Sequence, residues 1–447
     1  MDPNSSSKKN GNISRRKFLK NSVALTGASL LAPLSIGASA YAGGSDKLKL
    51  ALIGSGGRGT GAVVDALQAD DSVELIAIAD VFKDMVDRSY KALVADESRR
   101  KQINVPEEHK FAGLDAYKHA IALADVAILA TPPAFRPLHF EAAVNAGKHV
   151  FMEKPLATDA PGIRRILAAG KQAEQRGLSV VAGHQYRYAR LFQKLMDRIH
   201  RGTIGEVRSM TCNYLLAGIS IIPRQEGQTE LEYQLRNWRC FEWLWGGSPA
   251  GLTIHFEDIA HWAKGSYPIR AFGTGGRAAL KGPEHGNIYD HYYIDYEYED
   301  GTRLHSRTRH IPGCWTNRSL SFVGSDGTAN LTAGTDTEIK NLQGELIWSH
   351  QATEDPDPYQ TEHEVLFKAI RSEEPVNDTE WAALSSMTSI MGRMAVQSGK
   401  LIEWDDAFNS DLVLVPDDLS FDSQPPVLPK ENGYYPVPEP GGEIKVL

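Results

Sequence analysis

Three glycines give the clearest indication of a binding site. Gly54, Gly56 and Gly59 follow a short apolar run with the spacing G-x-G-x-x-G. Such a turn brings backbone N–H groups and the positive end of the following helix close to a pyrophosphate, because glycine has no side chain to hold the ligand away. A glycine-rich turn without a ligand is also common in α/β proteins. Asp80 favours a dinucleotide-binding turn over a turn without a ligand. It ends the next apolar run, 21 residues after Gly59, where an acid would hold a ribose hydroxyl.

Apolar runs that predict strands alternate with helical patterns along the sequence, and these strands and helices must position the glycines and Asp80. The connections between the runs are short, which predicts a doubly wound parallel sheet of the α/β class. Thr131, Pro132 and Pro133 follow one strong apolar run, and the carboxyl end of that strand would place them over a bound nucleotide. We expect strands over 48–53, 73–79, 110–113, 124–131, 149–152 and 178–182, and helices over 82–93, 136–146 and 160–176.

The pattern changes after Gly183, where strands dominate a second region. We expect strands over 208–215, 269–273, 292–298, 303–309 and 319–323, hairpin turns at 299–301 and 325–327, and a late helix over 381–398. The hairpins predict a mostly antiparallel sheet. The last 25 residues hold six prolines and no periodicity, so they form either a disordered end or an extended arm on a neighbouring surface. The chain therefore divides into a leader at 1–42, a dinucleotide-binding domain at 43–183, an α+β substrate and oligomerisation domain with a large open sheet at 184–422, and a Pro-rich arm at 423–447.

The segment A-G-K-H-V-F-M-E-K-P, residues 146–155, lies near the end of the first region. Together with the glycine turn and Thr131-Pro132-Pro133, it resembles the glucose-fructose oxidoreductase and inositol dehydrogenase (Gfo/Idh/MocA) family. The resemblance implies an N-terminal Rossmann domain, a lysine beside the nicotinamide, here Lys154, and a following proline that is often cis. Burial and a cationic nicotinamide would lower the pKa of this lysine from roughly 10.4 towards that of a useful base. The alternative is a surface lysine in a loop. We expect cofactor contacts from Gly54, Gly56, Gly57, Arg58, Gly59, Asp80, Thr131, Pro132, Pro133, His139, Glu153 and Lys154.

A second catalytic candidate is His255. In the family this region commonly carries an acid, the catalytic histidine four residues later and an aspartate three further on. Here His255 and Asp258 match, but Gly251 stands where the acid is expected, so a structural histidine is a serious alternative. We expect the substrate to contact Tyr186, Arg187, Trp238, Arg239 and Asp258. Aromatic faces beside Arg suit the C–H faces and hydroxyls of a sugar, although such a cluster is as often a packed interface.

The N-terminus carries Arg15-Arg16, a mild Ala/Leu/Gly/Ser run and small residues up to Ala42. This resembles a twin-arginine export signal cleaved near Ala40 or Ala42, which predicts a periplasmic protein. The chain has 48 basic and 56 acidic residues, net charge −8, and residues 1–42 carry +5 of that, so the body is acidic and unsuited to nucleic acid. Three scattered cysteines support neither a disulfide framework nor a metal site.

These patterns predict a periplasmic oxidoreductase that moves a hydride from a hydroxyl of a sugar, glycoside or cyclitol to a tightly bound nicotinamide cofactor. NAD is expected in preference to NADP because of Asp80. We also expect a homo-oligomer, dimer or tetramer, and an encounter with the twin-arginine export machinery. One alternative is an NAD-dependent glycosidase of the same fold that works by transient oxidation. Another is a sugar-binding protein without turnover, for which Gly251 is the only hint.

Overall fold

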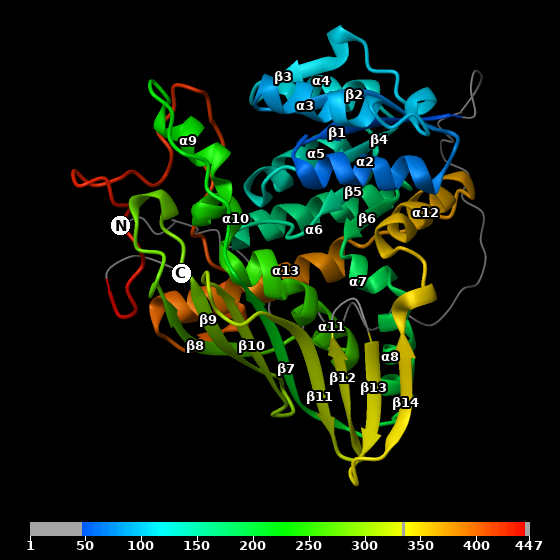
Figure 1. Ribbon diagram of the computed structural model, residues 1–447, viewed down its shortest axis with the longest axis vertical. Helices are drawn as coiled ribbons and strands as arrows, with labels where there is room; N and C mark the ends of the chain where they lie inside the picture. The colour runs from blue at the N-terminus through cyan, green and yellow to red at the C-terminus, as the bar shows by residue number, and fades with distance from the viewer. Residues whose placement is uncertain (1–46, 333–335, 443–447) are drawn as a thin grey trace, which may run out of the picture.

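The computed structural model describes residues 47–332 and 336–442. The predicted export signal at 1–42 lies outside these residues. Two sheets organise the described chain: a six-stranded sheet in the upper half of Figure 1 and a nine-stranded sheet in the lower half. Within residues 47–332 and 336–442, no helix is long and apolar enough to cross a membrane.

The first sheet is fully parallel and has the strand order β3-β2-β1-β4-β5-β6. This confirms the predicted doubly wound sheet. The order reverses between β1 and β4, and ligands of such sheets bind at that point, outside the carboxyl ends of the strands. The strands are β1 (Leu48–Ile53), β2 (Val73–Asp80), β3 (Lys110–Ala112), β4 (Val126–Leu129), β5 (His149–Glu153) and β6 (Val180–Gly183). The helices are α2 (Gly57–Ala69), α3 (Lys83–Val94), α4 (Ala116–Leu123), α5 (Arg136–Asn145) and α6 (Ala160–Gln175).

The second sheet has the order β14-β13-β12-β11-β7-β10-β9-β8-β15. Both predicted hairpins are present, since β9 pairs antiparallel with β10, and β11 with β12. The sheet is mostly antiparallel, as expected, but β10 and β7 pair in parallel. Its strands are β7 (Val207–Leu216), β8 (Arg270–Gly276), β9 (His291–Glu297), β10 (Arg303–His310), β11 (Asn317–Gly324), β12 (Gly327–Thr332), β13 (Asp336–Asn341), β14 (Leu346–Gln351) and β15 (Ile402–Glu403).

Two late helices join the sheets. α13 (Thr379–Ser398) lies between them, packing on β8 and β9 on one side and on α6 on the other (Figure 1). α12 (Pro358–Arg371) returns to the first sheet and packs on α2 and β6. The remaining α-helices are α7 (Gln185–Tyr188), α8 (Arg190–His200), α9 (Glu230–Arg236), α10 (Glu242–Trp245), α11 (Ile254–Lys264) and α14 (Trp404–Phe408).

The described part of the C-terminal arm, 423–442, has no helix or strand, yet it is packed against the rest of the chain. Tyr435 is buried and donates a hydrogen bond to Glu230 of α9, and the Tyr289 hydroxyl donates to the carbonyl of Pro438 at 2.6 Å. The described part of the arm therefore covers a surface of its own chain.

Candidate functional site

The glycine turn between β1 and α2 has the shape that a pyrophosphate needs. Gly54 has φ +92°, and a Cβ on Gly59 would lie 2.0 Å from the Gly54 carbonyl oxygen, so only glycine fits either position. At Gly56 and Gly57, by contrast, an added Cβ would meet no atom within 4 Å. The first turn of α2 has no acidic residue, and no side chain caps it. This open, positive helix end fits the anionic part of a dinucleotide.

Asp80, at the end of β2, is fastened to the same turn. One carboxylate oxygen accepts from the Ser55 backbone N–H at 2.7 Å and from the Ser55 hydroxyl at 3.1 Å, while the other accepts from the Phe82 N–H at 3.1 Å. Burial raises the pKa of Asp80, and these donors oppose the rise. The acid therefore lies beside the turn, where the sequence predicts a ribose contact.

Arg58 connects the turn to the end of β5. Its Nε lies 2.8 Å from Glu153, its Nη2 donates to Asp65 at 2.7 Å, and its guanidinium lies 4.6 Å from the ring centre of Tyr359. The predicted cofactor residues Arg58 and Glu153 are thus paired with each other. Their contact with a cofactor stays a prediction.

Thr131, Pro132 and Pro133 follow β4 and are held by Arg136, which sequence reasoning missed. The buried Arg136 guanidinium donates to the carbonyls of Thr131 and Pro155, so one side chain fixes the loops after β4 and β5 together. The Thr131 hydroxyl lies 3.2 Å from Nδ1 of His139, and burial lowers the pKa of that imidazole to about 3. In the sequence Arg136 reads only as the first residue of a helix.

Lys154 stands at the carboxyl end of β5, and its peptide bond to Pro155 is cis. Its ammonium donates to the backbone carbonyl of Gly251 at 2.8 Å, and within the described chain it forms no ion pair with a carboxylate. Burial lowers the pKa of Lys154 to about 8; the charge of Glu153 opposes this fall, and the charge of Arg239 adds to it. A lysine in this state releases its proton far more easily than one in water.

His255 lies on α11 among aromatic rings. Its ring centre is 5.2 Å from that of Tyr186, 6.1 Å from that of Tyr214 and 6.4 Å from that of His184. Nδ1 is buried, and no residue in the described ranges forms a hydrogen bond with it. Burial lowers the pKa of His255 well below its usual value, and the charges of Lys154 and Arg318 act in the same direction. The imidazole is therefore neutral near pH 7, with a nitrogen that has no partner in the protein.

Two residues predicted to contact substrate also contact each other. Arg187 forms a bidentate ion pair with Asp258 at 2.7 and 2.9 Å, and its guanidinium lies between the rings of Trp262 and Trp381. Asp258 is 1 % exposed and also accepts from the Ser385 hydroxyl. The pair braces α11 against α7 and α13, and the contact of either residue with a substrate stays a prediction.

The other predicted substrate residues have different surroundings. Tyr186 stacks on Phe192 at 4.4 Å and faces His255. Trp238 is half-buried and carries the exposed Arg239 guanidinium 5.0 Å from its ring centre. Tyr186 and Arg239 thus belong to the surroundings of His255 and Lys154 respectively. Their contact with a substrate stays a prediction.

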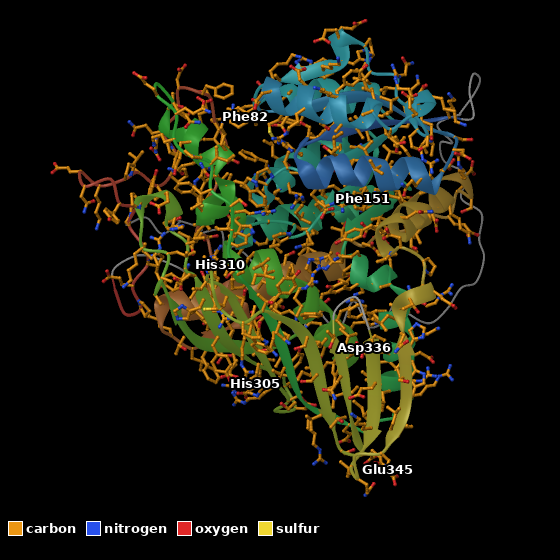
Figure 2. The ribbon with its side chains drawn as sticks, in the orientation of Figure 1. Phe82, Phe151, His305, His310, Asp336 and Glu345 are labelled. Atoms are coloured by element: carbon orange, nitrogen blue, oxygen red, sulfur yellow. The ribbon has the colours of Figure 1, made fainter. Side chains whose placement is uncertain are left out.

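The structure gives a reason, not visible in the sequence, why position 251 holds glycine and not the expected acid. A Cβ on Gly251 would lie 2.1 Å from the indole nitrogen of Trp245, so the indole fills the space of a side chain at 251. Trp245 also makes an edge contact with His310, which Figure 2 labels and which ends β10, at 5.8 Å between ring centres. The Trp245 indole therefore leaves no room for an acidic side chain at position 251. The Lys154 ammonium donates its hydrogen bond to the backbone carbonyl of Gly251 and not to such an acid.

A Rossmann sheet with an open glycine turn and a lysine at the end of β5 defines a class of NAD(P)-binding oxidoreductases. Two family descriptions match the chain: "Oxidoreductase family, NAD-binding Rossmann fold" over residues 48–182 and "Oxidoreductase family, C-terminal alpha/beta domain" over residues 196–396. The chain belongs to this oxidoreductase family, the Gfo/Idh/MocA family, as its motifs predicted.

The curated relatives include a sugar reductase and a glycosyl hydrolase family 109 protein. The chain is 30 % identical to a dTDP-3,4-didehydro-2,6-dideoxy-alpha-D-glucose 3-reductase of Actinomadura kijaniata, over 33 % of this chain and 36 % of the relative. That match spans about a third of the relative's length. The chain is also 22 % identical to "Glycosyl hydrolase family 109 protein 1" of Shewanella sp. (strain ANA-3), over 78 % of this chain and 71 % of the relative.

Solved structures support the fold over 80 % of the chain. An aldose-aldose oxidoreductase from Caulobacter crescentus, complexed with glycerol, aligns with a TM-score of 0.64 at 18 % identity, covering 80 % of this chain and 99 % of that chain. A putative myo-inositol dehydrogenase from Sinorhizobium meliloti 1021 aligns with a TM-score of 0.57 at 20 % identity and covers the same shares. At these identities the likeness shows the common fold.

Proposed function

We propose that this protein oxidises a hydroxyl group of a sugar, glycoside or cyclitol, with hydride transfer to a nicotinamide dinucleotide. The observation that carries the proposal is Lys154: it lies at the carboxyl end of β5, has no carboxylate partner in the described chain and has a pKa lowered to about 8. A structural surface lysine would need neither the burial nor the loss of basicity. A general base near neutrality needs both.

The cofactor would lie along the carboxyl edge of the first sheet, held at the glycine turn by Gly56, Gly57 and the start of α2 and at its ribose by Asp80. When bound, a nicotinamide supplies the hydride acceptor. The protein's own residues remove the proton of the hydroxyl that is oxidised. Neutral Lys154 accepts it at Nζ, while the Gly251 carbonyl fixes the direction of the amine. Neutral His255 hydrogen-bonds the same hydroxyl and holds it against Lys154.

The proposal also includes export in the folded state and a periplasmic location, which rest on Arg15 and Arg16 and the small residues before Ala42. A protein exported in this way must take up its nucleotide in the cytoplasm. We therefore propose that the cofactor remains bound through many turnovers.

A second candidate function is hydrolysis of a glycoside by transient oxidation on a retained cofactor. Similarity to glycosyl hydrolase family 109 proteins over 78 % of the chain favours it. Both functions use the same cofactor site and a base beside the substrate, so they differ in the product rather than in the binding of the nucleotide.

The test begins with protein purified after export and without added nucleotide. Mass spectrometry of the supernatant after heat denaturation identifies the nucleotide that the protein carries. A panel of sugars, glycosides and cyclitols is then added to the intact holoenzyme, and the near-ultraviolet absorbance of reduced nicotinamide is followed. We expect at least one compound to reduce the cofactor and Lys154→Met to abolish the signal while the nucleotide stays bound. Wild-type rates in that variant would remove Lys154 from the mechanism.

A further inference from the structure

Arg318 reaches the site from the second sheet. It lies on β11 directly opposite Tyr214 of β7, and residues directly opposite each other share one face of a sheet. The same face of β11 carries Leu320 and Phe322, which are fully buried. Tyr214 in turn stacks on the His255 imidazole, with 6.1 Å between ring centres and 19° between the planes. Arg318 is therefore a neighbour of the proposed catalytic histidine, although it is 63 residues away in the sequence.

Arg318 has no acidic partner among the described residues. Arg58, Arg187, Arg236 and Arg270 each form an ion pair with an Asp or Glu, whereas Arg318 forms none with any described residue. Its side chain is exposed, so its five N–H donors are open to a ligand. Lys154 and Arg239 likewise form no ion pair with a carboxylate in residues 47–332 and 336–442.

Two carboxylates near the site are engaged by other arginines. Glu153 shares Arg58 with Asp65, and Asp258 pairs with Arg187. The position where the resemblance places an acid is Gly251, and Trp245 fills its side-chain space. The charge of Arg318 acts on the site, since it contributes to the lowered pKa of His255 after burial and the charges of Lys154 and His184. Arg318 therefore places near His255 a positive charge that no described carboxylate pairs with, and such a charge attracts anions.

We propose that the substrate is an acidic sugar, a uronic acid or its glycoside, whose carboxylate is bound by Arg318. The proposal rests on the proposed oxidoreductase function and names the substrate class for the same site. The planar guanidinium matches a carboxylate with two parallel hydrogen bonds, and a single arginine balances its single charge. A phosphate dianion carries a second negative charge that one arginine does not balance. The hydroxyl that is oxidised and the proton acceptor Lys154 remain as described above.

The test compares matched pairs that differ only in charge: glucuronate with glucose, galacturonate with galactose and mannuronate with mannose, with glucose 6-phosphate as a further anion. Two readouts are used, calorimetric binding to the holoenzyme and reduction of its retained nicotinamide. The variant is Arg318→Gln. Arg307→Gln is the control. Arg307 is also exposed, but it lies on β10, which β7 separates from β11, and it points to the opposite face of the sheet, next to Tyr293.

We expect at least one uronic acid to bind more tightly than its neutral partner by about tenfold or more, as for one charge-assisted pair. Arg318→Gln should remove most of that preference and leave the neutral sugar within about threefold, while Arg307→Gln changes neither. Equal or tighter binding of every neutral partner, an equal loss for both members of a pair, or a preference for glucose 6-phosphate would overturn the assignment. These outcomes leave the oxidoreductase function standing. If no compound reduces the nicotinamide, that function fails, and an Arg318-dependent preference in binding would still support the acidic ligand.

Discussion

The indole of Trp245 occupies the space into which any side chain at Gly251 would project, with 2.1 Å between the added Cβ and the indole nitrogen. Gly251 belongs to a π-helical turn, residues 249–253, that leads directly into α11 and His255. The backbone of Gly251 has no left-handed torsion angle, so the indole, and not the backbone, requires glycine here. A side chain at position 251 is therefore compatible with this fold only if the Trp245 indole moves or is replaced by a smaller side chain.

The first prediction concerns the restoration of an acid at this position. We expect Gly251→Asp to destabilise the protein by about 1–3 kcal/mol, as overpacking of a buried site commonly does. Because Trp245→Ala opens the space, the two changes in one chain should cost less than the sum of their separate costs. Urea unfolding of the two single variants and the double variant gives the coupling energy between the sites. A Gly251→Asp protein as stable as the parent, or additive effects of the two changes, would contradict the proposed steric conflict.

The second prediction is a pH profile with one rising limb. The active form of Lys154 is the neutral amine, and its pKa is lowered to about 8, so kcat/KM should rise about tenfold per pH unit below that value and level off above it. His255 stays neutral because burial holds its pKa well below 6.5, so it adds no second limb between pH 6 and 8. Initial rates with the best substrate of the panel give the profile. A limb centred near 6.5 would instead make the titration of a histidine rate-determining.

The third prediction is a preference for NAD over NADP. The carboxylate of Asp80 is fixed beside the glycine turn by Ser55 and Phe82, where it would accept from a ribose hydroxyl and repel a 2′-phosphate. Lys83 does little to offset this, because its ammonium is engaged by Asp87 and by Glu107. Calorimetry on nucleotide-free protein should show roughly tenfold or more tighter binding of NAD.

The variants for this test separate recognition from loop structure. Asp80→Ala should weaken NAD binding and reduce the preference for NAD over NADP. Ser55→Ala is the matched control, because it removes the hydroxyl donor to Asp80 but leaves the carboxylate in place. Tighter binding of NADP by the parent protein would show that Asp80 has been given the wrong role.

Local patterns predicted most of the fold, and contacts between distant residues account for what they missed. The glycine turn, the parallel sheet and both hairpins are local, and each has a residue signature within a few positions. Strands β13 and β14 were not predicted because their sequences, D-T-E-I-K-N and L-I-W-S-H-Q, lack a clear alternation of apolar and polar residues. Their strand conformation depends on pairing with β12 and with each other.

The same reason explains which contacts within the site the sequence did not show. The ion pair of Arg187 with Asp258 spans 71 positions, and only the packing of α7 against α11 brings the two together. The replacement of an acid by the indole of Trp245 depends on the backbone path of residues 246–251. Arg318 lies just before the predicted strand 319–323, and only the register of β11 with β7 places it beside Tyr214.

The fourth prediction tests the proposed export route. Replacement of Arg15 and Arg16 by Lys keeps the positive charge but removes the paired guanidinium groups, so the precursor should accumulate in the cytoplasm. Fractionation followed by immunodetection measures the distribution, and Lys8→Arg with Lys9→Arg is a control that alters basic residues outside the motif. Normal periplasmic levels of the Arg15/Arg16 variant would refute this route, although a cleaved signal of another kind would remain compatible with them.

The last prediction concerns what resets the cofactor. Outside the cytoplasm there is no pool of soluble nicotinamide to replace a nucleotide lost after each turnover. The proposed periplasmic enzyme must therefore keep its cofactor and reset it in place, either with a second carbonyl substrate or by returning the hydride to a product of the same sugar. The nucleotide should survive gel filtration, and turnover should need no added NAD. With a glycoside as substrate, a keto-sugar that accumulates only with an added carbonyl acceptor supports the oxidoreductase, whereas free sugar released without an acceptor supports the glycosidase. If the protein leaves the column empty and works only with millimolar NAD, recycling in place is untenable, because every turnover would then depend on exchange with a pool that the periplasm lacks.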